Sequence, residues 1–93
     1  MISVALCTYN GEKYINSQIE SILNQSYPVD EIVVCDDGSK DDTINIINSI
    51  KNNCSIKITI RQNENNLGVC ANFEKAISLC NGDIVFLSDQ DDI

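Results

Sequence analysis

The chain has no histidine, only six basic residues against fourteen acidic ones, and no apolar run of 18 residues. Without histidine or a C-x-x-C pair, it lacks the usual ligands of a zinc site. The net charge of −8 argues against nucleic acid and anionic lipid as partners, because both attract basic surfaces. No run is long enough to span a membrane, and no basic segment precedes the apolar stretch Ile2–Cys7, which we predict to be a strand.

The five cysteines are an odd number, so at least one of them is unpaired. Each lies within or beside an apolar run, where a free cysteine behaves as a small hydrophobic residue. We therefore expect structural thiols in a protein of a reducing, cytoplasmic compartment. They are Cys7, Cys35, Cys54, Cys70 and Cys80.

The length of 93 residues, with 43% hydrophobic and 22% charged residues, is typical of one small globular domain. We therefore treat residues 1–93 as a single domain, since no repeat or linker divides them. The sequence stops directly after an acidic D-x-D-D loop. We expect the domain to be truncated after this loop and, with its modest core, to be of marginal stability.

Four short runs rich in Ile, Val and Leu alternate with three segments of helical periodicity. Near-continuous hydrophobicity predicts strands that are buried on both faces, as in a parallel sheet covered by helices. The third run alternates apolar and polar residues and is expected near an edge of the sheet. The predicted strands are Ile2–Cys7, Glu31–Cys35, Ile56–Arg61 and Asp83–Leu87.

The helical segments carry apolar residues three and four positions apart. The second is preceded by a capping-box pattern at Ser39–Asp42, and the third is followed by a C-cap signal, Asn81–Gly82. The alternating order of strands and helices predicts an α/β fold. We expect a Rossmann-like parallel sheet in the order 3-2-1-4, with helices on both faces. The helical segments are Ile15–Leu23, Ile44–Ile50 and Val69–Cys80.

Polar residues gather where the predicted strands end, and nothing comparable stands where the strands begin. The carboxyl ends of parallel strands meet at one edge of a sheet, where ligands bind. We therefore expect one site built from four loops. The loops are Thr8–Glu12, Asp36–Ser39, Asn63–Gly68 and Ser88–Asp92.

Three carboxylates, Asp89, Asp91 and Asp92, stand within four residues of one another after the last strand. Like charges this close repel each other unless a cation compensates them. Carboxylate and phosphate oxygens suit Mg²⁺ or Mn²⁺, whereas the residues of an EF-hand loop are missing. The alternative is a solvated turn, but Asp36 and Asp37 at the same edge favour a metal site.

The segment Asp36–Ser39 has two possible roles, which are compatible with each other. Its acids and its serine can accept free N–H groups at a helix start, or they can accept hydrogen bonds from a nucleobase or a ribose. Asp41 and Asp42 are assigned to capping alone. Three glycines at strand-to-helix passages are expected where positive φ or close ligand approach is needed; they are Gly11, Gly38 and Gly68. The absence of G-x-G-x-x-G and G-x-x-x-x-G-K disfavours an NAD-type fold and a P-loop.

Five motifs stand in order along the chain: Ala5–Gly11, Gln25–Pro28, Val33–Thr43, Asn66–Gly68 and Gly82–Asp92. Together they resemble the opening of family 2 glycosyltransferases, above all bacterial enzymes of surface-polysaccharide synthesis, including rhamnosyltransferase-like members. The resemblance implies the N-terminal, nucleotide-sugar-binding half of a GT-A fold in a hexosyltransferase.

The resemblance also implies roles for particular residues. The nucleotide pocket would contain Thr8, Tyr9, Asn10, Glu12 and Asn66, with Asp36 or Asp37 on the base and Asp89 on the ribose or the sugar. Asp91, with Asp89, would hold Mn²⁺ or Mg²⁺ on the diphosphate, where the metal acts as a Lewis acid for the departing nucleoside diphosphate. Asp92 belongs either to the same metal shell or to the following helix.

The partners implied are a UDP- or dTDP-sugar donor and a glycan or lipid-linked acceptor, but no nucleic acid. The implied location is cytoplasmic, peripheral to the inner face of the membrane. Two departures stand out: no arginine follows Asn66–Gly68, and no acceptor-binding half is present. We expect the catalytic base beyond Ile93, so that the isolated chain would be inactive and would self-associate through its truncated face.

Two other classes of protein remain as alternatives. A non-catalytic nucleotide-binding or interaction module could use the same scaffold. A phosphoacceptor signalling domain also uses acids and Mg²⁺ at strand ends, but it needs its acidic pair after the first strand, which here ends in Thr8-Tyr9-Asn10.

Overall fold

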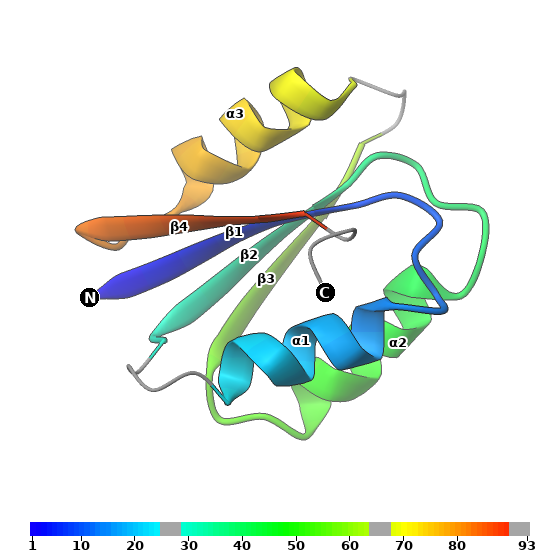
Figure 1. Cartoon of the computed structure of the whole chain (residues 1–93), viewed down its shortest axis with the longest axis horizontal. Coiled ribbons are helices and arrows are strands. Elements are labelled where there is room, and N and C mark those ends of the chain that lie inside the picture. The colour runs from blue at the N-terminus through cyan, green and yellow to red at the C-terminus, as the bar shows by residue number, and fades with distance from the viewer. Residues whose placement is uncertain (25–28, 64–67, 90–93) are drawn as a thin grey trace.

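The computed structural model describes residues 1–24, 29–63 and 68–89. Strands and helices alternate from one end to the other (Figure 1). The elements are β1 (Ile2–Thr8), α1 (Ile15–Leu23), β2 (Glu31–Asp36), α2 (Thr43–Asn52), β3 (Lys57–Gln62), α3 (Val69–Leu79) and β4 (Ile84–Asp89).

The four strands form one parallel sheet in the order β3-β2-β1-β4. The predicted fold class, strand order and strand direction are therefore confirmed. The predicted strand boundaries differ from the observed ones by one or two residues. In register, Thr8 lies opposite Asp36, and Cys7 lies opposite Asp89. The loops that follow the four strands therefore all begin at the same edge of the sheet, which we call the carboxyl edge.

The burial of the strands explains their hydrophobic patterns. β1 and β2 lie in the middle of the sheet, and Leu6 and Val34 at their centres are fully buried. β3 is an edge strand, where Ile58 is buried while Lys57 and Arg61 are exposed. The alternating pattern of β3 therefore predicted its edge position correctly.

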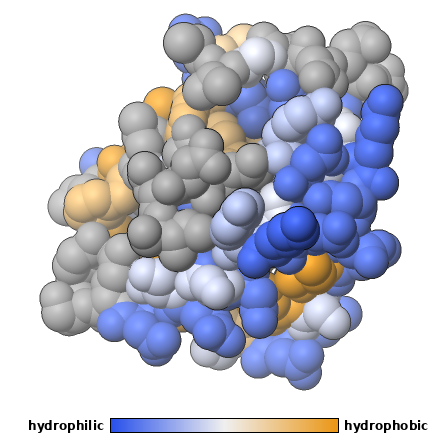
Figure 2. Space-filling model, turned by 45° about the vertical axis from the view of Figure 1, so that its right-hand side comes forward, coloured by the Kyte–Doolittle hydropathy of each residue, from blue (hydrophilic) through white to orange (hydrophobic). Residues whose placement is uncertain are grey.

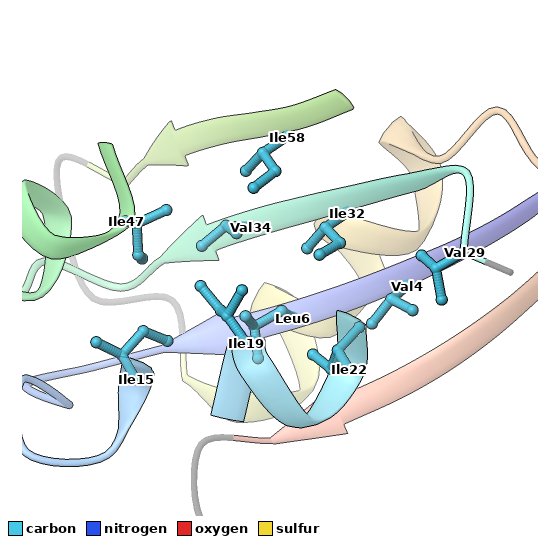
Figure 3. Packing of buried hydrophobic residues seen from close by; sticks show 10 residues of the cluster. All are labelled: Val4, Leu6, Ile15, Ile19, Ile22, Val29, Ile32, Val34, Ile47 and Ile58. Carbon is cyan, nitrogen blue, oxygen red and sulfur yellow. The ribbon is translucent and has the colours of Figure 1, made fainter. Parts of the chain in front are cut away.

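Helices cover both faces of the sheet, with α1 and α2 on one face and α3 on the other (Figure 1). Apolar side chains of α1 and α2 pack onto β1, β2 and β3 in the main core (Figure 3). Its ten residues are Val4, Leu6, Ile15, Ile19, Ile22, Val29, Ile32, Val34, Ile47 and Ile58. On the other face, α3 packs against the sheet through a smaller cluster of small side chains, which are Ala5, Cys7, Cys35 and Ala76. Among the described helices, none is long and apolar enough to cross a membrane.

The helix caps differ from the predicted ones. Asp42 is the N-cap residue of α2 but makes no side-chain capping bond, and the N–H of Thr43 donates instead to Asp41 Oδ1 at 3.0 Å. Ser39 takes no part in capping because its hydroxyl donates to Asp36. The capping box is therefore wrong, and so is the capping role predicted for Asp42. Asp41 does accept the first N–H of α2, but not as a cap alone, because it also accepts the N–H of Glu12.

The predicted C-cap at Asn81–Gly82 is also wrong. α3 ends at Leu79, Cys80 is already extended, and Gly82 is not among the glycines with positive φ. Gly82 instead packs against β1, where an added Cβ would lie 2.8 Å from the carbonyl oxygen of Met1 and 2.9 Å from the nitrogen of Ser3. A glycine is needed here for close approach and not for a turn.

A buried carboxylate holds together the edge of the sheet where the strands begin. Glu31 is 1% exposed, and it accepts hydrogen bonds from Ser3 Oγ at 2.5 Å and from the backbone nitrogen of Asn81 at 2.6 Å. Burial alone would raise the pKa of Glu31, but these hydrogen bonds and the charge of Lys57 outweigh burial and hold the pKa below its ordinary value of 4.5. Glu31 therefore ties β2 to β1 and to the segment that follows α3.

The lowered pKa of Glu31 predicts a stabilising contribution that depends on pH. This contribution is fully present above the unfolded-state pKa and is lost as the pH falls through the lower folded-state pKa. Glu31→Gln should therefore lower the free energy of unfolding by about 1–3 kcal/mol at pH 7, with the difference from the original chain shrinking below about pH 4.5. Urea unfolding across pH 3–7 measures this, with exposed Glu20→Gln as the matched control. A difference that is independent of pH would contradict the assignment.

Candidate functional site

Backbone and side-chain hydrogen bonds join the loop after β1 to the loop after β2. The N–H of Asn10 donates to Ser39 Oγ at 2.7 Å, and the N–H of Lys40 donates to Asn10 Oδ1 at 2.8 Å. The N–H of Gly11, which follows Asn10, donates to Thr43 Oγ1 at 2.8 Å. Asn10 therefore fixes the relative position of two of the four predicted loops.

The predicted need for positive φ is confirmed at two of the three glycines. Gly38 has φ 91° and Gly68 has φ 86°. At the first passage Asn10 takes the left-handed conformation, with φ 49°, and Gly11 does not, so of the two reasons predicted for Gly11 only close ligand approach remains. Asparagine tolerates this conformation better than most residues, so the turn is made one position earlier than the glycine suggested.

Glu12 joins the same two loops one step further along the chain. Its N–H donates to Asp41 Oδ2 at 3.2 Å, and its own carboxylate accepts the N–H of Asp42 at 3.3 Å. The first bond contributes to a lowered pKa of Asp41: slight burial raises this pKa, but hydrogen bonds from Thr43 and Glu12 outweigh burial. These acids therefore act as acceptors for backbone N–H groups.

Asp36 is fully buried and is surrounded by donors from the protein itself. Its Oδ1 accepts from Thr8 Oγ1 at 2.6 Å and from Ser39 Oγ at 2.5 Å. Its Oδ2 accepts from the N–H of Gly38 at 3.2 Å and of Ser39 at 2.7 Å. A carboxylate has about four acceptor positions. Asp36 uses that number within the protein, so its contacts fit the first of the two roles expected for this segment, the structural one.

Asp37 has a different environment, at the start of α3. It is 9% exposed, and its Oδ1 accepts from Asn63 Nδ2 at 3.0 Å while its Oδ2 accepts from the N–H of Gly68 at 3.2 Å. Gly68 is the N-cap residue of α3. Asp37 therefore connects the end of β2 both to the segment after β3 and to α3.

Asn63, Asn72 and Lys75 extend this network and were not predicted as site residues. Asn63 Nδ2 donates also to Asn72 Oδ1 at 2.8 Å, and Asn72 Nδ2 donates to the carbonyl oxygen of Cys35 at 2.9 Å. Lys75 Nζ donates to Asn63 Oδ1 at 2.7 Å. One signal was available in the sequence, because Asn72 is a polar residue within the apolar face of the third helical segment.

A hollow of about 450 Å³ lies at the carboxyl ends of β2 and β3. It is lined by Asp36, Gly38, Ser39, Gln62 and Asn63. This volume falls within the range of small-molecule sites. In Figure 2, which brings the right-hand side of Figure 1 forward, most of the coloured residues toward the right of the view are hydrophilic.

A larger hollow of about 530 Å³ lies elsewhere, between α1, α2 and the segment before β3. Its lining includes Leu23, Ile50 and Ile56, and it holds only one acid, Glu20. No set of polar groups converges there comparable to the network around Asp36 and Asp37. The hollow at the carboxyl edge is therefore the better candidate for a functional site.

The predicted site residues fall into three groups. Thr8, Asp36 and Asp37 are buried together at the carboxyl edge, whereas Asn10, Glu12 and Tyr9 are exposed, Tyr9 at 41%. Asp89 ends β4 at the same edge, but its side chain lies outside the described part of the structure. Asn66, Asp91 and Asp92 lie outside the described residues altogether.

Within residues 1–24, 29–63 and 68–89, no group of three His, Cys, Asp or Glu residues is arranged to hold a metal ion. The predicted D-x-D-D site falls mainly beyond these ranges. Burial raises the pKa of the Cys35 thiol, and the charges of Lys75 and Arg61 offset this only in part. Cys35 is therefore a structural thiol, as predicted.

Comparison with known proteins gives a match along almost the whole chain. The model of the family described as "Glycosyl transferase family 2" matches residues 3–93. Abequosyltransferase RfbV from Salmonella typhimurium is 37% identical over 94 residues, covering 99% of this chain and 28% of RfbV. The chain spans about a third or less of the length of the first curated relatives it matches.

Two solved structures share the fold. TarS 1–349 from S. aureus, in complex with UDP-GlcNAc, superimposes with a TM-score of 0.86 at 33% identity, covering 97% of this chain and 26% of that one. The mannosyltransferase PcManGT from Pyrobaculum calidifontis, in complex with GDP-Man and Mn²⁺, gives a TM-score of 0.89 at 27% identity, covering 97% of this chain and 27% of that one.

The hydrogen bonds of Asp36 predict a structural role that a stability measurement can test. Asp36→Ala leaves buried donors of Thr8, Gly38 and Ser39 without their acceptor and should lower the free energy of unfolding by about 3 kcal/mol. Asp83→Ala is the matched control, because it removes the same charge from an exposed residue whose carboxylate meets only the terminal amine, at 3.4 Å. Equal losses in the two variants, measured by urea unfolding, would contradict the structural role.

Proposed function

The chain belongs to glycosyl transferase family 2, and we propose that it is the donor-binding part of an enzyme that transfers a sugar from a nucleoside diphosphate to an acceptor. The proposed pathway class is the synthesis of surface polysaccharide or another glycan, and the relative RfbV is named an abequosyltransferase. The supporting observation is the polar hollow at the carboxyl edge, which is lined by Asp36, Gly38, Ser39, Gln62 and Asn63.

We assign the base contact to Asp37 and not to Asp36. The acceptor positions of Asp36 are occupied by Thr8, Gly38 and Ser39. Asp37 accepts from Asn63 and from Gly68, and its assignment rests on the full set of partners of Asp36. A carboxylate accepts hydrogen bonds only, so the partner expected for Asp37 is an N–H group of a nucleobase.

The rest of the nucleotide pocket is assigned to the loops that surround the hollow. Tyr9, which is 41% exposed, is assigned to the nucleotide pocket, while Thr8, Asn10 and Glu12 hold the loops in place. We further assign Asn66 to the nucleotide sugar and Asp89 to the ribose or the sugar. UDP- and dTDP-sugars are the proposed donors; TarS, which shares the fold, was solved with UDP-GlcNAc.

A divalent metal, Mn²⁺ or Mg²⁺, fits the chemistry of the acids after β4. Asp89 ends β4 beside Cys7 of β1, and Asp91 and Asp92 follow it directly in the sequence. Their oxygen ligands suit these ions, and the related PcManGT was solved with Mn²⁺. We propose that these three acids hold the metal, which, when bound, acts as a Lewis acid for the leaving diphosphate.

The remaining chemistry of transfer is assigned outside this chain. A base must remove the proton of the acceptor hydroxyl, and the acceptor must be oriented for attack. We propose that both functions belong to a part of the protein beyond Ile93, with a glycan or a lipid-linked acceptor at the cytoplasmic face of the membrane. Exposed Ile77 and Phe86, at about 40% each, are candidates for the surface on which that part packs or through which the isolated chain self-associates.

The metal assignment predicts a change in nucleotide binding without a loss of fold. Asp91→Asn should lower the apparent affinity for Mn²⁺ by about 100-fold and so remove the metal dependence of nucleoside diphosphate binding. Relief of charge repulsion should leave the stability unchanged or slightly raised. Isothermal titration with UDP, with and without Mn²⁺, measures the effect, and Asp83→Asn is the control of equal charge change. Unchanged Mn²⁺ dependence in Asp91→Asn would exclude Asp91 as a ligand.

If the general base lies beyond Ile93, the isolated chain should bind the donor but should not turn it over. The isolated chain should bind a nucleoside diphosphate but transfer no sugar above background, because loss of a general base alone costs roughly 10²–10⁴-fold in rate. A radiolabelled-donor assay compares this chain with a version extended to the length of its relatives. If the two turned over at comparable rates, the acceptor part would be dispensable and the division of labour proposed here would be wrong.

A further inference from the structure

Gln18 is a polar residue within the apolar face of α1. Its neighbours on that face, Ile15, Ile19 and Ile22, pack against the sheet (Figure 3), and Gln18 is comparably buried, at 1% exposure. Burial of an amide costs free energy unless hydrogen bonds replace those made to water, and a leucine would fill this position without that cost. The amide therefore indicates a specific contact.

This contact is made with the end of β4. Gln18 Nε2 donates to Ser88 Oγ at 3.0 Å, across 70 residues of the chain. Ser88 is half-buried and lies opposite Leu6 of β1, whose side chain belongs to the main core beneath α1. The hydrogen bond therefore joins α1 to β4 at the residue before Asp89, the last residue of the strand.

The end of β4 has fewer backbone ties than the central strands have. Within the described part of the chain, β4 pairs with β1 alone, so backbone hydrogen bonds hold it from one side. Its last register pair joins Asp89 to Cys7. The amide of Gln18 adds a tie from the face of the sheet, one residue before the strand ends. It thereby fixes the point from which the chain leaves the sheet.

We propose that Gln18 is a positioning residue of the metal site, which holds Ser88 and so fixes the end of β4 from which the acids Asp89, Asp91 and Asp92 follow. This inference rests on the proposed metal site. Mg²⁺ demands near-ideal octahedral geometry, so a displacement of the segment that carries its ligands weakens binding. Groups that orient metal ligands typically contribute about 10–100-fold in metal affinity. Because Gln18 acts through Ser88, we expect a contribution of about tenfold, at the lower end of this range.

A purely structural role of Gln18 would have a different signature. A hydrogen bond that only satisfies two polar groups contributes to the free energy of unfolding, and its loss does not act on the metal in particular. A positioning role instead separates the affinity for the metal from the affinity for the nucleotide alone. The first is the apparent Kd of Mn²⁺ in the presence of UDP or dTDP, and the second is the Kd of the same nucleotide in EDTA.

The test is isothermal titration of the original chain and of variants that remove either partner of the hydrogen bond. Gln18→Leu and Ser88→Ala should each raise the apparent Kd of Mn²⁺ by about tenfold and leave the Kd of the nucleotide in EDTA unchanged. The double variant should lose no more than either single variant, because both remove the same bond. Ser88→Thr keeps the hydroxyl and should keep the affinity for Mn²⁺. Leucine and glutamine have similar helix propensities, and Ser88 is only half-buried, so we expect the variants to fold.

Ser3→Ala is the matched control. It also removes a serine hydroxyl that is bonded to a buried side chain, Glu31, but at the edge of the sheet where the strands begin. It should lower the stability and leave the affinity for Mn²⁺ unchanged. The inference would be overturned by a loss of Mn²⁺ affinity in Gln18→Leu no larger than that in Ser3→Ala, or by an equal loss of nucleotide affinity in EDTA. If the original chain bound neither nucleotide in a Mn²⁺-dependent way, the proposed function would be overturned, and the inference with it.

Discussion

The buried carboxylate of Asp36 is the constraint on which the carboxyl edge depends. An acid without solvent contact is costly unless donors surround it, and the chain supplies them from Thr8, Gly38 and Ser39. To do so, the chain after β2 must turn back on itself, with φ 91° at Gly38. Ser39 then lies within reach of the N–H of Asn10, and the loop after β1 is fixed as well. One buried acid therefore organises two of the loops that surround the hollow.

The two adjacent acids differ because their side chains meet different parts of the fold. Asp36 pairs in register with Thr8 and points to the same side of the sheet as the main core residue Val34, two positions earlier. Asp37 instead contacts Asn63 and the start of α3. One acid therefore builds the loop and lines the hollow, while its neighbour joins the end of β2 to Asn63 and to the start of α3.

The sequence was sufficient to predict the sheet because its strands carry strong, continuous apolar patterns, and the alternation in β3 marked the edge. The predictions of the helix caps were wrong because a local sequence pattern does not show contacts made elsewhere. Ser39 donates to the carboxylate of Asp36 and so does not cap α2. Gly82 donates to Ser3 of β1, which lies 79 residues away in the chain. The sequence could not show which of Asp36 and Asp37 has the structural role, because the two residues are identical and adjacent. Only their hydrogen bonds distinguish them.

Asn63 and Lys75 were missed for a related reason. Asn63 was grouped with a polar loop, and a lysine on a helix is ordinarily a solvated charge; only the topology brings the two side chains to Asp37. At the opposite edge of the sheet, where the strands begin, Glu31 is buried between Ser3 and Asn81. Both acids are held by donors from distant parts of the chain. What distinguishes Asp37 is that its hydrogen-bond partner Asn63 also lines a hollow of about 450 Å³. Because Lys75 of α3 donates to the same Asn63, the position of α3 is coupled to the network at the carboxyl edge.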